Sequence, residues 1–319
     1  FKVSPTNLSK IPTDPVVTGA SEGIGRAYAV ALAERGLNVV IMSRTKEKLD
    51  QLAEEIGEKT GQKVKVIVAD FTKDDIYGDI EEQLQDLNVG VLVNNVGALP
   101  TFIPCRFLDT KELDTVITKV INCNVKTMMK MCRIVLPGME NRRKGLIVNI
   151  SSGIVCVPIP LYTLYAASKV FVERFSRGLQ AEYKDKGILI QAITPFGVST
   201  RLAGYQKANI VTFMPDDFVK TSLQYLRAGD KTAGSVSHTI LGWFLQSIPH
   251  KLLHSELAMA RMCDFVKKKT QTRIKISTTK VTCSEQPALS LHEVQRAQWE
   301  LEALRSQRIH PNYSYQLLG

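Results

Sequence analysis

The sequence predicts an α/β fold with a doubly wound parallel sheet in a single domain, followed by an extra C-terminal tail. Two observations predict it. From Pro15 onward, short β-branched runs alternate with longer helical patterns, and a glycine-rich turn separates the first run from the first helix. Strands alternating with helices form β-α-β units whose sheet is covered on both faces. We therefore expect a Rossmann-type sheet.

The elements follow in order along the chain. The first strand enters a helix over Ile24–Arg35, and the second enters a charged helix over Thr45–Thr60. Pro15 lacks an N–H donor, so it fits a central strand only at the first position. The six expected strands are Val16–Thr18, Asn38–Ser43, Val64–Ala69, Val89–Asn94, Leu146–Ser151 and Ile188–Thr194, with a seventh beyond residue 230.

The chain divides into three parts by sequence texture. Residues 1–14 are polar and proline-broken, which predicts an irregular segment, and residues 15–270 form the expected domain. Residues 271–319 form a polar tail with one possible helix, whose apolar residues recur at three- and four-residue spacing. These are Leu291, Val294, Ala297, Leu301 and Leu304.

Composition excludes several classes of protein. Hydrophobic residues make up 44% and charged residues 23% of the 319, which excludes global disorder, collagen and a disulfide miniprotein. The longest apolar runs fall well short of the ~20 residues of a membrane-spanning helix. Six cysteines show no zinc spacing, so we expect no metal site. Of the net charge of +10, seven charges fall beyond residue 200, which indicates an anionic partner.

A glycine-rich turn predicts a phosphate site. In Thr18-Gly-Ala-Ser-Glu-Gly-Ile-Gly25, a backbone without Cβ atoms allows close approach of a pyrophosphate to the N–H groups of the helix N-terminus. The expected cofactor contacts here are Gly19, Ser21, Gly23, Ile24 and Gly25.

Three further positions lie at strand ends and predict the choice of dinucleotide. In dinucleotide-binding folds an acidic residue at the end of the second strand favours NAD, and this position holds Arg44 instead. Its guanidinium suits the 2′-phosphate of NADPH, and the alternative is a solvated surface arginine. Asp70 either accepts from an adenine amino group or caps the next helix. Asn94 ends the fourth strand, where the following backbone turn can line the cofactor ribose.

A tyrosine and a lysine predict proton transfer. Tyr165 and Lys169 stand four residues apart and share one helix face. A nearby ammonium stabilises a phenolate, so we expect Lys169 to lower the Tyr165 pKa and to hold the nicotinamide ribose. Ser152, at the end of a strand, can polarise a substrate carbonyl. Each residue alone has an ordinary structural reading, but their joint order with the glycine-rich turn indicates a reductase.

These motifs together resemble the short-chain dehydrogenase/reductase family over residues 15–265. The resemblance implies that Asn124 completes a catalytic tetrad with Ser152, Tyr165 and Lys169. The loop after the sixth strand supplies two further expected cofactor contacts, Val198 and Thr200. The cofactor that the resemblance implies is NADPH/NADP.

The resemblance is strongest to family members that act on lipophilic ketones. The segments 69–77, 91–100, 149–153 and 218–220 are similar to enzymes that reduce a 17-ketosteroid or a very-long-chain 3-oxoacyl-CoA. It also implies an endoplasmic reticulum membrane protein, whose N-terminal anchor would precede Phe1, and a possible homodimer. A non-catalytic NADP-binding scaffold is the alternative. We expect no nucleic-acid partner, because the chain has no basic strand interleaved with aromatic residues.

Two apolar segments bear on the substrate and on the membrane. The loop over residues 195–214 suits a lid above a lipophilic ligand, or ordinary core packing. Its apolar members are Leu202, Tyr205, Ile210, Val211, Phe213 and Met214. The segment Ile240–Pro249 either lies at an anionic membrane surface beside Lys251, Arg261 and Lys267–Lys269, or is a buried helix.

Overall fold

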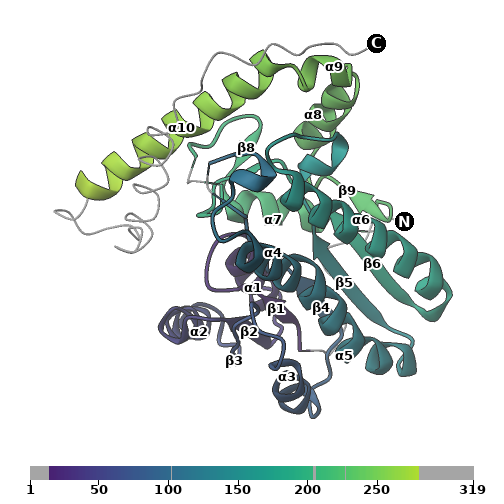
Figure 1. The fold of residues 1–319 in the computed structure, drawn as a ribbon. Coiled ribbons are helices and arrows are strands. Elements are labelled where there is room, and N and C mark those ends of the chain that lie inside the picture. Colours follow the sequence, from purple (N-terminus) through teal and green to yellow (C-terminus); the bar gives the residue numbers. More distant parts are fainter. Residues whose placement is uncertain (1–13, 102, 204–205, 227, 280–319) are drawn as a thin grey trace.

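The computed structural model describes residues 14–101, 103–203, 206–226 and 228–279 (Figure 1). A seven-stranded sheet runs in the order β3-β2-β1-β4-β5-β6-β9, and every neighbouring pair is parallel. The expected fold class is confirmed, including a seventh strand beyond residue 230. The strands are β1 (Val16–Thr18), β2 (Val39–Ser43), β3 (Val64–Val68), β4 (Val91–Asn94), β5 (Gly145–Ile150), β6 (Ile188–Ile193) and β9 (Lys231–Thr232).

Helices cover both faces of this sheet, because its strands are apolar on both sides. Successive strand residues point to opposite faces, so Val17 and Ile41 join one core while Val16 and Val40 join the other. The first face carries α1 (Gly23–Ala33), α2 (Lys46–Thr60) and α7 (Pro215–Gln224). The second carries α3 (Tyr77–Leu84), α4 (Leu113–Ile121), α5 (Thr127–Asn141) and α6 (Thr163–Tyr183).

Pro15 fits the start of the central strand. It lies just before β1, where no ladder N–H is needed, and its carbonyl accepts from the Val40 N–H at 2.7 Å. Because β1 has β2 on one side and β4 on the other, the chain changes direction across the sheet between them. In open α/β sheets, ligands bind at this switch point, beyond the carboxyl ends of the strands.

A second small pairing lies outside the main sheet. Strands β7 (Gly197–Val198) and β8 (Thr212–Phe213) pair at the base of the loop that follows β6. Beyond them come α8 (Val236–Gln246), α9 (His250–Leu253) and α10 (Glu256–Thr279), and α10 crosses the top of the view in Figure 1. No helix in the described ranges is both long and apolar enough to cross a bilayer.

The ends of the chain test the expected boundaries only in part. Helix α10 continues to Thr279, past the boundary expected at residue 270. Of the irregular segment expected over residues 1–14, residues 1–13 lie outside the described residues, as do the possible helix over residues 291–304 and Tyr205.

Candidate active site

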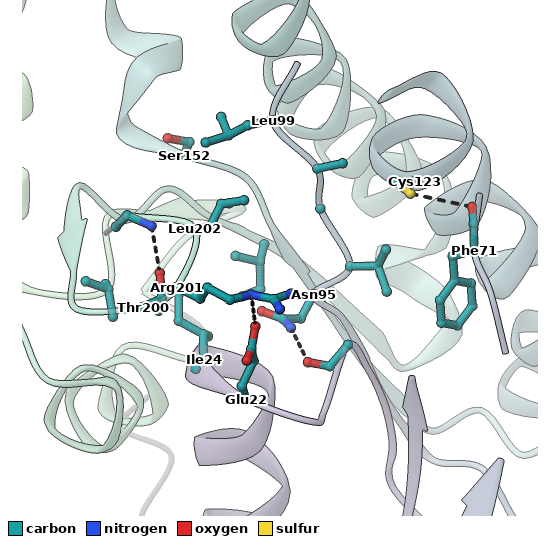
Figure 2. Close-up of a pocket in the computed structure, with 18 of the residues that line it drawn as sticks. Glu22, Ile24, Phe71, Asn95, Leu99, Cys123, Ser152, Thr200, Arg201 and Leu202 are labelled. Carbon is teal, nitrogen blue, oxygen red and sulfur yellow. Dashed lines mark hydrogen bonds and ion pairs between the residues drawn. The ribbon is translucent and has the colours of Figure 1, made fainter. Parts of the chain in front are cut away.

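A cavity of about 430 Å³ opens at the carboxyl edge of the sheet, at the expected switch point (Figure 2). The segments that follow β1, β2, β3, β4, β5 and β6 all contribute to its walls. Eleven of the fourteen predicted site residues line it: Gly19, Ser21, Gly23, Ile24, Arg44, Asp70, Ser152, Tyr165, Lys169, Val198 and Thr200. Gly25, Asn94 and Asn124 do not line this cavity.

The glycine-rich turn is shaped by close contacts that a side chain would fill. Gly19 has a φ of +65°, a left-handed conformation that favours glycine. A Cβ atom at Gly25 would lie 2.3 Å from the Gly19 carbonyl oxygen. Gly25 therefore allows α1 to pack closely against the turn, and other residues of the turn, such as Gly19 and Gly23, face the cavity. This bare cradle at the N-terminus of α1 fits the pyrophosphate of a dinucleotide.

Asn95 holds this turn, a role that the sequence prediction gave to no residue. Its Nδ2 donates to the carbonyls of Thr18 at 3.2 Å and Gly19 at 3.1 Å. Asn94 instead lies in the core beneath the cavity, where its Nδ2 donates to Asn149 Oδ1 at 2.8 Å. Adjacent residues at a strand end point to opposite sides, so only one of these two asparagines reaches the cavity.

Charged side chains gather where Arg44 was expected to bind a phosphate. Arg44 is exposed and lines the cavity together with Lys48 and Arg201. Arg201 and Lys48 both pair with Glu22, at 2.6 and 3.4 Å. The Glu22–Arg201 pair joins the glycine-rich turn to the loop after β7 across the cavity (Figure 2). Sequence reasoning missed this pair because its members lie far apart in the chain.

Asp70 does not cap the next helix, because α3 begins at Tyr77 and has Ile76 as its N-cap residue. Instead, Asp70 Oδ1 accepts from the Thr72 backbone N–H at 3.1 Å and from the Thr72 hydroxyl at 2.9 Å. These bonds form a local turn, as short polar side chains often do. The same residue lines the cavity, so the turn fixes the carboxylate at the wall.

Tyr165 and Lys169 lie on one face of α6, as their spacing predicts. The Lys169 Nζ is 5.8 Å from the centre of the Tyr165 ring and donates to the Ile150 carbonyl at 3.0 Å. Burial lowers the pKa of Lys169 to about 8. Burial also raises the pKa of Tyr165 to about 12, against a hydrogen bond with Ser152 that lowers it. The lowering of the Tyr165 pKa that we expected from Lys169 is therefore wrong for the protein as described.

These three side chains can polarise and protonate a carbonyl oxygen. The Ser152 hydroxyl also accepts from the Ile154 N–H at 3.4 Å, which holds it at the start of a 3₁₀ turn. A tyrosine with a raised pKa is protonated at neutral pH and can donate. Lys169 is almost completely buried, so its amine is fixed beside the cavity.

Asn124 lies in a π-helical turn, Asn122–Lys126, between α4 and α5. Its amide bonds both backbone groups of Ala98: Oδ1 accepts from the N–H at 2.7 Å and Nδ2 donates to the carbonyl at 3.0 Å. Nδ2 also donates to Ser168 Oγ at 2.9 Å. Turns of this kind often mark functional sites. Asn124 thus fixes the strand-end loop against α6, through its bonds to Ala98 and Ser168.

The loop after β6 forms part of the cavity wall. Of its apolar residues, Leu202 lines the cavity, whereas Ile210 is exposed to 84% and faces away from any core. A Cβ atom at Gly23 would lie 3.0 Å from Thr200 Cγ2, so this loop packs directly against the glycine-rich turn. No group of three or more metal-ligating side chains occurs within the described part of the chain.

Comparisons with known proteins agree with this geometry. The profile of the short chain dehydrogenase family matches residues 15–210. A 17-beta-hydroxysteroid dehydrogenase type 3 of Danio rerio is 59% identical over 252 residues, which cover 79% of this chain and 82% of the relative. A very-long-chain 3-oxoacyl-CoA reductase of Anas platyrhynchos is 48% identical over 235 residues, covering 73% and 75%.

A solved structure shares the fold. It is a short-chain dehydrogenase from Sphingobium yanoikuyae in complex with NADPH, 27% identical to this chain, with a TM-score of 0.64. The match covers 74% of this chain and 96% of the other. Its bound cofactor is the same dinucleotide that Arg44 predicts from the sequence.

Proposed function

Because this chain belongs to the short-chain dehydrogenase family, as the match over residues 15–210 shows, we propose that it reduces a 17-ketosteroid with NADPH, converting androstenedione to testosterone. The chain is an oxidoreductase that acts on the CH–OH/C=O pair. The observation that carries the steroid assignment is the 59% identity to a 17-beta-hydroxysteroid dehydrogenase type 3. The resemblance found in the sequence pointed to this activity and, as the alternative, to reduction of a very-long-chain 3-oxoacyl-CoA.

Bound NADPH supplies the hydride for the reduction. The proposed holders of its phosphates are the turn residues Gly19 to Ile24 and, for the 2′-phosphate, Arg44. Asp70, the expected partner of the adenine amino group, and Thr200, a further expected cofactor contact, line the same cavity. Lys169 takes the ribose side of the site. Gly25, Asn94 and Asn124 support these residues from the protein side.

The protein's own part of the reaction is proton delivery. The Ser152 hydroxyl donates a hydrogen bond to the ketone oxygen and stabilises the charge that develops there. Tyr165 gives its phenolic proton to that oxygen. Because burial raises the pKa of Tyr165 to about 12, the phenol carries this proton at neutral pH and can donate it. Lys169, held by the Ile150 carbonyl, lies beside the phenol as it loses its proton.

Substrate competition tests the steroid assignment. The full chain with NADPH is offered androstenedione and, in parallel, a very-long-chain 3-oxoacyl-CoA, with NADPH oxidation and product mass as readouts. Preference for the acyl-CoA would support the second candidate, which rests on the 48% identity to an acyl-CoA reductase. With the preferred ketone, Tyr165→Phe should lower kcat by about 10²–10⁴-fold, since it removes the proton donor. NADPH binding without turnover of either ketone would support the non-catalytic scaffold.

We further propose that the outer face of α8–α10 rests on an anionic membrane surface. Helix α8 buries His238 and Gly242 on one side and exposes Val236, Ile240, Trp243 and Phe244 on the other, with exposed fractions of 58–77%. Exposed apolar residues continue at Leu252, Leu257 and Phe265, with exposed cations at Lys251, Arg261 and Lys268 and exposed acids at Glu256 and Asp264. An apolar face edged by cations is typical of interfacial helices.

Vesicle binding tests this surface. Trp243→Asp should reduce sedimentation with phosphatidylserine vesicles, while Val68→Asp, at a 51% exposed valine in the edge strand β3 at the other end of the sheet, should not. Equal binding of both variants would contradict the proposal. Loss of a dimer in Trp243→Asp, seen by analytical ultracentrifugation, would instead assign this face to the expected homodimer. Localisation at the endoplasmic reticulum remains a prediction from the resemblance, and imaging of the tagged full-length protein tests it.

A further inference from the structure

His238 occupies a closed aromatic site at the start of α8. Its exposed fraction is 0%, and Ser235 fixes its backbone by accepting from the His238 N–H at 3.2 Å. Three phenylalanine rings surround the imidazole, with centroids 5.8 Å (Phe196), 5.1 Å (Phe213) and 5.8 Å (Phe218) away. A polar ring buried this completely must find hydrogen-bond partners within the protein.

Two of those partners lie at the two ends of one loop, and the ring also faces the backbone of Gly197 and Ala233. The Phe196 N–H donates to His238 Nδ1 at 3.3 Å, and Nε2 lies 3.1 Å from the Val211 carbonyl oxygen. Because Nδ1 accepts, the ring proton sits on Nε2, which donates to Val211. Burial lowers the pKa of His238 below its ordinary value of 6.5, so the ring is neutral at pH 7 and keeps both bonds. A single side chain thus ties residue 196 to residue 211.

The loop between these residues forms a wall of the active-site cavity. It carries Thr200, Arg201 and Leu202, all of which line the cavity. The pairing of β7 with β8 closes its base, in register from Gly197↔Thr212. His238 lies against that base and bonds the residue directly before each of the two strands.

Phe196 connects this anchor to the proposed catalytic serine. A Cβ atom at Gly153 would lie 2.4 Å from Phe196 Cδ1, so the phenyl ring lies flat against the residue after Ser152. The Gly153 N–H also donates to the Pro195 carbonyl at 2.7 Å. Movement of the backbone at Phe196 is therefore transmitted to the Ser152 turn.

We propose that His238 is a positioning residue for ketone binding: it fixes both ends of the 196–211 loop and, through Phe196, the placement of Ser152. The inference rests on the proposed ketone reduction for its kinetic consequence. The anchoring of the loop by His238 is independent of the proposed reduction, because it is a property of the protein without substrate. His238 touches neither the cavity nor the reacting atoms, so its effect is indirect.

Three substitutions separate the two hydrogen bonds. His238→Phe keeps an aromatic ring and removes both bonds, His238→Asn offers an acceptor near the Nδ1 position, and His238→Gln offers a donor near the Nε2 position. Tyr28→Phe is the matched control, because the buried Tyr28 hydroxyl bonds Ser222 Oγ at 2.6 Å between α1 and α7, away from the loop.

Hydrogen exchange of peptides 195–203 and 206–214, without substrate, reads the anchoring directly. We expect about tenfold faster exchange of both peptides in His238→Phe, since two buried bonds are lost. His238→Asn should restore protection of the first peptide, and His238→Gln that of the second. With NADPH saturating, kcat/KM for the ketone should fall about tenfold in His238→Phe, because the loop wall contributes to ketone binding and Ser152 stabilises charge that develops in the transition state.

The outcomes distinguish the two proposals. Unchanged exchange of both peptides in His238→Phe overturns the anchoring, whatever the kinetics. Faster exchange with an unchanged kcat/KM for the ketone, or an equal fall of kcat/KM in Tyr28→Phe at matched loss of thermal stability, overturns the positioning role. If the wild-type protein turns over no ketone, the proposed reduction fails, and the exchange experiment alone decides the anchoring.

Discussion

Replacing Gly25 by alanine tests how the glycine-rich turn holds a cofactor. The added Cβ would lie 2.3 Å from the Gly19 carbonyl oxygen and 2.5 Å from Asn95 Nδ2, both inside the 3.0 Å that real Cβ atoms respect. Neither neighbour can yield freely. The carbonyl belongs to the backbone of the turn, and Asn95 Nδ2 is held by two hydrogen bonds to that same turn. The turn must therefore move.

The size of the effect follows from that movement. Overpacking of this kind costs about 1–3 kcal/mol of unfolding free energy. A displacement approaching 1 Å of groups that position a ligand costs on the order of 10–100-fold in function. We therefore expect the Kd for NADPH, measured by fluorescence titration, to rise about 10–100-fold in Gly25→Ala. The temperature of unfolding should fall at the same time.

Gly178→Ala is the matched control within helix α6. No atom lies within 4 Å of the position where its Cβ would be. Alanine in a helix interior is about 0.5–1 kcal/mol more favourable than glycine, so this variant should be more stable. Its Kd for NADPH should be unchanged. Wild-type NADPH affinity in Gly25→Ala would refute the claim that the close contact between Gly25 and Gly19 shapes the site.

Three further predictions concern charges at the site. Arg44→Asp should weaken the binding of NADPH and relatively favour NADH, which the ratio of the KM values for the two cofactors measures. An unchanged ratio would show that Arg44 does not contact the 2′-phosphate. Because burial lowers the pKa of Lys169 from 10.5 to about 8, the charged form opposes folding below pH 8, and this cost of about 3 kcal/mol is recovered as pH rises toward 10.5. Denaturant unfolding should therefore show Lys169→Met more stable than wild type at pH 7, with the difference shrinking by pH 10; a constant difference would contradict the assigned pKa. Glu22→Gln removes the ion pair with Arg201 that joins the glycine-rich turn to the loop after β7, so NADPH dissociation measured by stopped flow should become up to about fivefold faster. Because 1 M salt screens this ion pair in the wild-type protein, the difference between the two proteins should disappear at that salt concentration.

The sheet and its glycine-rich turn were predictable because their signals are local. Strand burial on both faces appears as unbroken apolar runs, and the left-handed Gly19 appears as a glycine at a strand end. The same locality explains why Tyr165 and Lys169 were placed correctly on one helix face. Their order along the chain then sufficed to bring them to the cavity, because the carboxyl ends of parallel strands meet at one edge.

The misjudged features depend on contacts between distant segments. The Tyr165 pKa follows from how completely the surrounding chain buries the phenol, and that burial outweighs a lysine at 5.8 Å from the ring. The choice between Asn94 and Asn95 depends on where β4 ends, and a shift of one residue reverses it.

The loop after β6 shows why the most informative residues for function were the hardest to find. Its sequence predicts only an apolar segment near the substrate. In the structure, Glu22 holds one point of this loop across the cavity and His238 holds both of its ends. Glu22 lies within the glycine-rich turn but is not one of its expected contacts, and His238 belongs to no motif, since any polar side chain at the right place in the fold can serve. Catalytic residues need a particular side chain at a particular spacing, so a sequence motif can reveal them. Residues that position the cavity wall need only contact the loop in the folded protein, so they are identified from the structure.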